Sequence, residues 1–174
     1  IPARNEAENL TNCVSEICDE LENRSIDYEI LVIDDGSTDN TSEIIQNLST
    51  SYPAVKCINN SGDNGFGRAI RLGFQKYTGD AVAIMMADQS DSPKDLSTYW
   101  RLLQDGHDCV FGSRFIKGAQ IYDYPKMKLL ANRTVNTLIR YAFKIKCNDI
   151  TNAFKIYRRE VIDGCKPLIS PHFN

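Results

Sequence analysis

The sequence predicts an α/β fold whose open, mostly parallel sheet carries helices on both faces. Short apolar runs without alternation, such as residues 30–33 and 81–85, are typical of strands buried on both faces. Amphipathic stretches with apolar residues at three- and four-residue spacing separate these runs. Strand and helix alternate in this way through most of the chain, and right-handed crossovers then give a parallel sheet.

Apolar spacing places the helices. Leu10, Val14, Ile17 and Leu21 predict an amphipathic helix over residues 8–23. We expect a second helix after a cap at Asp39 or Thr41, and a third after the turn at residues 65–67. Two further helices should begin at Pro93 and at Lys126. In the last of these, residues 126–144, the side chains of Ala131, Val135, Leu138 and Ala142 should point inward.

The remaining apolar runs are the expected strands. They are "YEILVID", "AVKCI", "DAVAIMMAD", "DCVFGSRF", and a short strand between a loop and a helix start in "CNDITNAFKIYRREVI". Three of these runs end in polar clusters, at residues 34–37, 88–91 and 112–114. Ligands bind beyond the carboxyl ends of the strands in such sheets, so the convergence of the three clusters predicts a catalytic site.

Composition agrees with a single domain. The chain has 174 residues, of which 42% are hydrophobic and 25% charged. Its net charge of −3 gives no general reason to expect a nucleic-acid partner. No apolar run approaches the roughly 20 residues that span a bilayer. Since the chain begins at Ile1 rather than Met and stops at "SPHFN", we expect residues 1–174 to be one catalytic domain that lacks its first strand and its C-terminal part.

Each motif also has a purely structural interpretation. Asn5 can cap the first helix, and Asp-Gly is a common turn pair. The repulsion between Asp34 and Asp35 at a buried strand end nevertheless has to be offset, and a ribose, a base donor or a metal would do so. Ser92 and Asp95 form a capping-box pattern around Pro93, which leaves Asp88 and Asp91 unexplained.

In series, these motifs resemble family 2 glycosyltransferases of the GT-A fold. The matching residues are Ile1-Pro2-x-x-Asn5-Glu6, Asp34-Asp35-Gly36-Ser37, Asn64-Gly65-Phe66-Gly67-Arg68-Ala69, Ala87-Asp88 and Gly112-Ser113-Arg114. The stretch "NDITNAFKIYRREVI" is similar to one in the polyprenyl-phosphate branch, typified by dolichyl-phosphate mannose synthase. The resemblance implies transfer of a sugar from a nucleotide-diphosphate sugar to a polyprenyl phosphate, with inversion at the anomeric carbon.

The resemblance also assigns roles to residues. Those that would contact the nucleotide sugar are Pro2, Arg4, Glu6, Asp34, Asp35 and Ser37. Asp88 would bind Mg²⁺ or Mn²⁺ on the donor diphosphate, with Ser90 and Asp91 as further metal-ligand candidates. Ser113 and Arg114 would lie near the acceptor phosphate, and Arg114 and Asp88 would be the catalytic pair. Further phosphate contacts are expected from Lys126, Lys128 and Arg133.

The chain departs from the family pattern at a few positions. Met86 replaces the first Asp of the Asp-x-Asp metal motif, Asn152-Ala153 replaces Ser-Gly, and Lys155 replaces Arg. A single carboxylate is still chemically sufficient, because Mg²⁺ typically takes one or two carboxylates together with water and substrate phosphates. These changes indicate a subgroup with its own donor or acceptor and a variant metal site.

Two other functions stay open. One is transfer to a sugar hydroxyl in cell-surface polysaccharide synthesis, which needs a general base that a phosphate acceptor does not need. The other is a non-catalytic nucleotide-sugar-binding domain in which Met86 marks a lost metal site. For the transferase, we expect a cytoplasmic domain at the cytoplasmic face of a membrane. The basic helix has two interpretations that stay open, a face that rests on anionic lipid headgroups and an ordinary solvated helix face.

Overall fold

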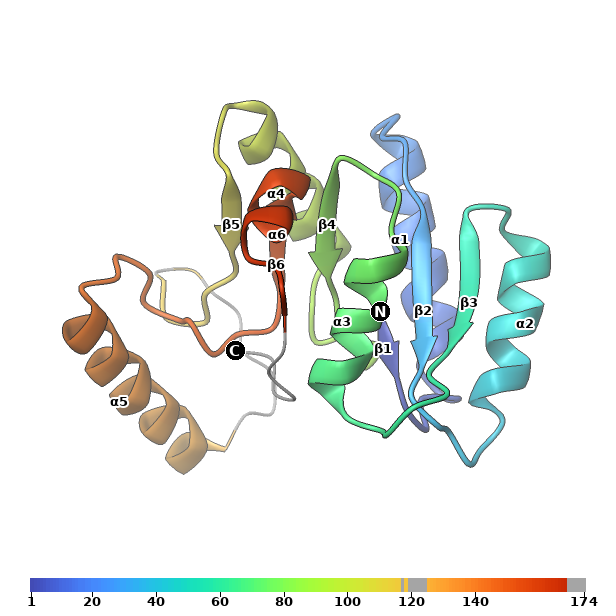
Figure 1. Ribbon diagram of the computed structural model, residues 1–174, viewed down its shortest axis with the longest axis horizontal. Coiled ribbons are helices and arrows are strands. Elements are labelled where there is room, and N and C mark those ends of the chain that lie inside the picture. Colours follow the sequence, from blue (N-terminus) through green and yellow to red (C-terminus); the bar gives the residue numbers. More distant parts are fainter. Residues whose placement is uncertain (117, 119–124, 169–174) are drawn as a thin grey trace.

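The computed structural model describes residues 1–116, 118 and 125–168, except for the side chain of Lys126. It contains two three-stranded sheets whose strands follow one another across the molecule (Figure 1). The first sheet has the order β1 (Pro2–Ala3), β2 (Ile30–Asp34), β3 (Val55–Asn59), and all of its strands are parallel. The predicted α/β class is therefore confirmed, with the apolar run at residues 30–33 in a central, buried position.

The second sheet differs from the prediction in one respect. Its order is β4 (Ala81–Ile84), β6 (Lys155–Arg158), β5 (Cys109–Phe111), and β6 runs antiparallel to both of its neighbours. The segment between β5 and β6 is long enough to return the chain to either end of the sheet, so the apolar pattern of β6 did not encode its direction. β4 and β5 still point the same way, so their carboxyl ends share one edge.

Helices cover both faces of the strands. On one face, α1 (Leu10–Asn23), α2 (Thr41–Ser51) and α4 (Pro93–Gln104) pack around Val14, Ile45 and Leu96. On the other face, α3 (Phe66–Lys76) and α6 (Arg159–Gly164) enclose a smaller core with Phe74 and Ile162. In Figure 1, α1 and α4 lie behind the strands, and α3 and α6 lie in front.

Two predicted caps are wrong in detail. Ser92 is the N-cap residue of α4 and Pro93 follows it, but the Ser92 side chain makes no capping hydrogen bond, so no capping box forms. Its carbonyl accepts from the backbone N–H of Asp95 instead. Asn5 does not cap α1 either, because that helix starts at Leu10. The side chain of Asn5 binds another loop, described below.

The helix α5 (Lys126–Phe143) forms as predicted, but its predicted inward face is wrong. Ala131, Val135, Leu138 and Ala142 are all exposed. Figure 1 shows α5 set apart from the other helices. Among its described side chains, Asn136 alone is buried. The amphipathic pattern of α5 is real, but its apolar side faces outward from the described residues.

Between the two sheets lies a cavity of about 520 Å³, lined by side chains of β2, β4, α1 and α3 that include Leu31, Ala83 and Phe74. The described strands β1 and β4, which belong to different sheets, are not hydrogen-bonded to each other at this place. The loops that follow β1, β2, β4 and β5 leave the strands at the same edge, which is the lower edge in Figure 1. Within the described part of the chain, no helix combines the length and apolarity needed to cross a bilayer.

Candidate active site

The loops after β1 and β2 are joined into one framework. Asn5, at a positive φ of 57°, accepts hydrogen bonds at its Oδ1 from the N–H (2.8 Å) and hydroxyl (3.2 Å) of Thr38. The N–H groups of Asn5 and Glu6 donate to the hydroxyls of Ser37 (3.1 Å) and Thr41 (2.8 Å). Three residues predicted to contact the nucleotide sugar lie in or before this loop. Arg4 is exposed, Glu6 is half-buried, and Pro2 is buried in β1.

Asp35 follows β2 directly and joins the β2 end of the framework to the loop before α3. Its side chain is 4% exposed, and its two oxygens accept from Asn60 Nδ2 (2.6 Å) and from the backbone N–H of Gly65 (2.7 Å). The carboxylate thereby holds the Gly-rich turn before α3 against the end of β2. A Cβ on Gly36 would lie only 2.7 Å from the Asn64 amide, so the same two loops require a glycine there.

Asp34 is turned into its own loop. Its Oδ1 accepts from the N–H of Ser37 (2.9 Å), and its Oδ2 accepts from the hydroxyl of Ser42. Burial opposes ionisation, but these hydrogen bonds outweigh it and leave the pKa of Asp34 below its ordinary value. The expectation that a ligand must offset the repulsion between Asp34 and Asp35 is therefore wrong, because protein donors satisfy both carboxylates.

The cluster after β4 is a tight turn around Gln89, which has a positive φ of 59°. Asp88 is exposed, and its Oδ1 accepts from the N–H of Ser90 (3.0 Å). Asp91 folds back so that its Oδ2 accepts from the N–H of Met86 (2.9 Å). Burial raises the pKa of Asp91 to about 6, the Met86 hydrogen bond works against this shift, and the charge of Asp88 adds to it.

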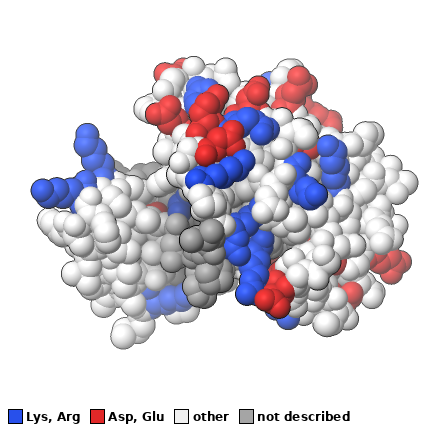
Figure 2. Space-filling model, in the orientation of Figure 1, with Lys and Arg blue, Asp and Glu red and all other residues white. Residues whose placement is uncertain are grey.

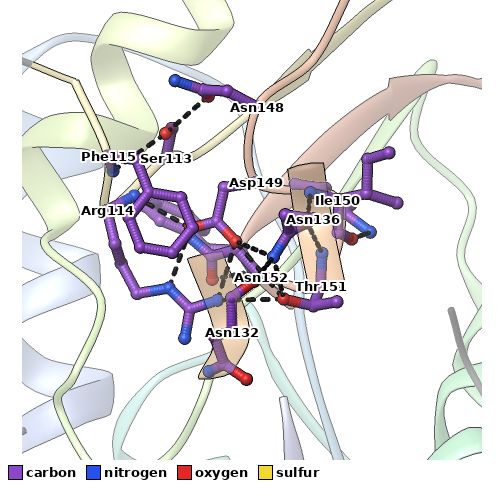
Figure 3. A network of polar contacts seen from close by, with 12 residues as sticks. Ser113, Arg114, Phe115, Asn132, Asn136, Asn148, Asp149, Ile150, Thr151 and Asn152 are labelled. Carbon is purple, nitrogen blue, oxygen red and sulfur yellow. Dashed lines mark hydrogen bonds and ion pairs between the residues drawn. The ribbon is translucent and has the colours of Figure 1, made fainter. Parts of the chain in front are cut away.

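A basic group follows β5. The Arg114 guanidinium lies with its Cζ 5.6 Å from the centre of the Phe115 ring, and the Cζ of Arg133 on α5 lies 6.0 Å from the same ring. Two of the predicted acceptor-phosphate residues thus lie near one aromatic side chain; Figure 3 shows Arg114 beside Phe115. Ser113 donates to Asn148 Oδ1 (2.8 Å), and Lys128 is exposed on α5.

The clusters after β4 and β5 are electrostatically coupled, because the positive charge of Arg114 lowers the pKa of Asp91. The acidic turn and the basic group therefore lie at the same edge of the fold. Within the ranges that the structure describes, no three His, Cys, Asp or Glu side chains come together as a metal site. A divalent ion would thus need ligands from the substrate as well as from Asp88.

Sequence reasoning missed several residues of this edge: Asn60, Phe115, Asn136 and Asp149. Asp149 is fully buried and binds the side chain of Arg114 through Nε (2.8 Å) and Nη2 (2.7 Å). The charged residue in the "NDIT" segment was the available signal. Its partner, however, lies 35 positions away in the sequence, beyond the range of local pattern.

The fold and this edge define a GT-A glycosyltransferase domain. The chain matches the family model described as "Glycosyl transferase family 2" over residues 1–165, and it belongs to that family. It is 34% identical over 166 residues to a dolichol-phosphate mannosyltransferase of Pyrococcus furiosus, covering 94% of this chain and 46% of that protein. It is 32% identical over 167 residues to a polyprenol monophosphomannose synthase of Mycolicibacterium smegmatis, covering 94% of this chain and 62% of that protein.

A solved structure supports the fold. The structure of a mannosyltransferase from Pyrobaculum calidifontis in complex with GDP-Man and Mn²⁺ superimposes with a TM-score of 0.60 at 19% identity, covering 94% of this chain and 44% of that one. The chain thus spans only about half the length of these relatives, between 44% and 62%.

Proposed function

We propose that this domain transfers a sugar from a nucleotide-diphosphate sugar to a polyprenyl phosphate, with inversion at the anomeric carbon. The observation that carries the proposal is the division of one edge into an acidic half and a basic half. The acidic half is the turn after β4 with Asp88 and Asp91, and the basic half holds Arg114 and Arg133. Two relatives at 34% and 32% identity, named for transfer to dolichol phosphate and for polyprenol monophosphomannose synthesis, support the acceptor class.

The basic half suits a phosphate acceptor. A guanidinium binds phosphate oxygens through charge-assisted hydrogen bonds, and the Cζ atoms of Arg114 and Arg133 lie 5.6 Å and 6.0 Å from the centre of the Phe115 ring. An acceptor phosphate is already ionised at neutral pH, so its oxygen can attack the anomeric carbon without a general base. The bond from that carbon to the donor diphosphate breaks, and the nucleoside diphosphate leaves. The residues at this edge therefore need to orient two anions and keep them from repelling each other.

The acidic half suits a divalent ion in part. Asp88 is exposed and sits in a tight turn, which fits one carboxylate ligand to Mg²⁺ or Mn²⁺, with the donor diphosphate supplying others. A bound ion would stabilise the negative charge that builds on the leaving diphosphate. Ser90 lies beside Asp88 in the turn, and Asp91 supports the turn through the Met86 N–H, so both remain further candidates.

The exposed side of α5 suits an anionic membrane surface. Met127, Leu130, Leu138 and Tyr141 recur at helical spacing and are 79%, 62%, 64% and 78% exposed. Residues 126–148 contain lysines and arginines but no acidic residue. An amphipathic helix of this kind lies in the headgroup region of anionic bilayers. A lipid acceptor would then be delivered to the cytoplasmic face, close to Arg114 and Arg133.

A transfer assay tests the proposal. The purified protein is mixed with farnesyl phosphate and, in separate reactions, with radiolabelled GDP-mannose, UDP-glucose or UDP-N-acetylglucosamine, with Mn²⁺, with Mg²⁺ or with EDTA. We expect a labelled lipid from one donor, with GDP-mannose the first to test because both relatives are named for mannose. Donor binding without product from any acceptor would instead support a binding domain, and product with a sugar hydroxyl alone would support the polysaccharide alternative.

The Asp88→Asn variant tests the metal ligand in the same assay. We expect its turnover to fall by about 100-fold or more, since one of few metal ligands is lost. Asp63→Asn, at an exposed aspartate that pairs with Arg68, is the control and should keep normal turnover. Turnover and Mn²⁺ dependence that are unchanged in Asp88→Asn would rule out the proposed ligand.

A further inference from the structure

The Arg114 side chain is held by a buried carboxylate. Asp149 is fully buried, whereas the side chain of Arg114 is 22% exposed. Asp149 Oδ2 accepts from the backbone N–H (2.9 Å) and the Nε (2.8 Å) of Arg114, and Oδ1 accepts from Nη2 (2.7 Å). This two-pronged contact fixes both the position and the plane of the guanidinium (Figure 3). Arg114 Nη2 also donates to the Thr151 hydroxyl (3.2 Å).

Asn136 holds the turn that carries Asp149. It comes from α5, and its side chain is 1% exposed. Its Oδ1 accepts from the N–H groups of Ile150 (2.6 Å) and Thr151 (3.2 Å), and its Nδ2 donates to Thr151 Oγ1 (2.8 Å) and lies 3.4 Å from Asp149 Oδ1. One buried amide therefore connects α5 to the carboxylate of Asp149 and to the two residues that follow it.

The loop with Arg114 is also fixed from its other side. The N–H of Gly112 donates to the Phe154 carbonyl (2.9 Å), and a Cβ on Gly112 would lie 2.7 Å from the Tyr99 hydroxyl and 3.0 Å from Asn152 Nδ2. Ser113 binds Asn148. The segments after β5 and before β6 are thus in contact over several successive residues, which leaves Arg114 little freedom to turn.

Stability alone is a weak reason for this arrangement. A buried ion pair loses most of its Coulomb energy to desolvation, and well-packed apolar residues of similar size serve stability as well or better. What a buried carboxylate provides is orientation. A guanidinium has five N–H groups, and a carboxylate bound to its Nε edge directs the rest of the group outward. In this orientation the Cζ of Arg114 lies 5.6 Å from the centre of the Phe115 ring, and the side chain is 22% exposed.

We propose that Asp149 and Asn136 are positioning residues that act through Arg114, holding its guanidinium in the orientation that binds the acceptor phosphate. This inference rests on the proposed function, because it takes the acceptor to be a phosphate. Neither residue contacts the substrate. Since Asn136 belongs to α5, the same contacts also connect the helix proposed to rest on lipid with the cation that receives the lipid phosphate.

The test measures the affinity for farnesyl phosphate by calorimetric titration of the intact protein, and the KM values for acceptor and donor in the transfer assay. The variants are Asp149→Asn and Asn136→Ala, each alone and combined with Arg114→Ala. Asp163→Asn is the charge-matched control, because it removes a carboxylate from an exposed ion pair with Lys166. Circular dichroism at the assay temperature selects the variants that are folded.

We expect Asp149→Asn and Asn136→Ala to weaken farnesyl phosphate binding and raise the acceptor KM by about tenfold or more, which is the usual effect of losing an oriented charged hydrogen bond. The donor KM should change less than twofold. In the Arg114→Ala background neither change should have a further effect, because residues that act through one group are not additive. A purely structural role would not produce that loss of additivity.

Three results would overturn the inference. Folded Asp149→Asn and Asn136→Ala proteins that bind farnesyl phosphate as the wild type does would remove the positioning role and leave the proposed function standing. So would an equal loss of affinity with and without Arg114. Absence of farnesyl phosphate binding by the wild-type protein would remove the acceptor class itself, and the inference with it. If Asp149→Asn is unfolded, Asn136→Ala carries the test alone.

Discussion

Asp34 and Asp35 are adjacent in the sequence but have different surroundings. Asp35 joins two loops through Asn60 and Gly65, whereas Asp34 stays within its own loop, bound to Ser37 and Ser42. Both carboxylates are therefore part of the scaffold that shapes the donor side. The adjacent charges need no ligand, since backbone and hydroxyl donors reach each of them.

The Asp34→Asn variant tests this structural role. We expect the free energy of unfolding at pH 7 to fall by about 1–3 kcal/mol, because hydrogen bonds to a charged acceptor are replaced. The folded-state pKa of Asp34 lies below its ordinary value of 3.8, so its stabilisation is present above that pH and is lost as the pH falls through the folded pKa. The difference in the free energy of unfolding between the wild type and the variant should therefore become smaller as the pH is lowered toward 3.

Urea unfolding at pH 7 and at pH 3 measures both effects. Asp27→Asn, at an exposed aspartate, is the control and should unfold as the wild type does at both pH values. A variant as stable as the wild type at pH 7 would show that the hydrogen bonds from Ser37 and Ser42 contribute nothing to the fold.

At the scale of elements, α5 shows what amphipathic spacing can and cannot predict. The spacing of Ala131, Val135, Leu138 and Ala142 correctly predicted the helix, but its exposed apolar side is formed by Met127, Leu130, Leu138 and Tyr141. Spacing does not say what covers that side, and here no described residue buries it. In Figure 2, Lys and Arg appear on the part of the surface formed by α5, at the left. Charge and exposure together favour a lipid surface over a protein core.

The Leu138→Gln and Arg140→Gln variants test this docking. We expect each to leave the free energy of unfolding within about 0.5 kcal/mol of the wild type, as is usual for exposed positions. Each should lower the fraction of protein that sediments with vesicles of phosphatidylcholine and phosphatidylglycerol. Lys76→Gln, on α3, removes an equal charge from another exposed site and should not change sedimentation. Equal sedimentation of all variants would exclude α5 as the docking surface.

The strands show a second limit. Apolar runs located β2, β4 and β5, and their carboxyl ends meet at one edge as expected. The pattern of β6 gave its position but not its direction, because direction depends on where the preceding loop returns. The same holds for Asp149. Its buried carboxylate binds Arg114, which lies 35 residues earlier, and a long-range pair of this kind leaves no periodic trace in the sequence.

At the scale of the whole molecule, two cores on opposite faces share the same strands. The larger contains Val14 and Ile45, and the smaller contains Phe74 and Ile162. The strands couple them, so we expect the domain to unfold in one transition. Trp100, the single tryptophan, lies on α4 and lines the cavity between the two sheets, so its fluorescence reports on the interior of the domain.

The Phe74→Ala variant tests this coupling. It removes a side chain that is 6% exposed, so the free energy of unfolding should fall by about 3 kcal/mol. Because the strands couple the two cores, the fluorescence of Trp100 and the far-UV circular dichroism should still change at the same urea concentration. Lys76→Gln, an exposed change on the same helix, should leave the midpoint in place. Separate midpoints for the two signals would mean that the cores unfold independently.

The order of strands in the second sheet has a consequence for synthesis of the chain. β6 lies between β4 and β5 but is the last of the three to be made, after residue 154. Until β6 leaves the ribosome, β4 and β5 have no partner strand in this sheet. The ion pair between Arg114 and Asp149 likewise cannot form until Asp149 has been made. Such long-range pairing is slow and leaves strand edges exposed. The side that would bind the nucleotide sugar is built from earlier residues and can thus form before the acceptor side, and nascent chains that end before Arg158 should be the ones that require chaperones.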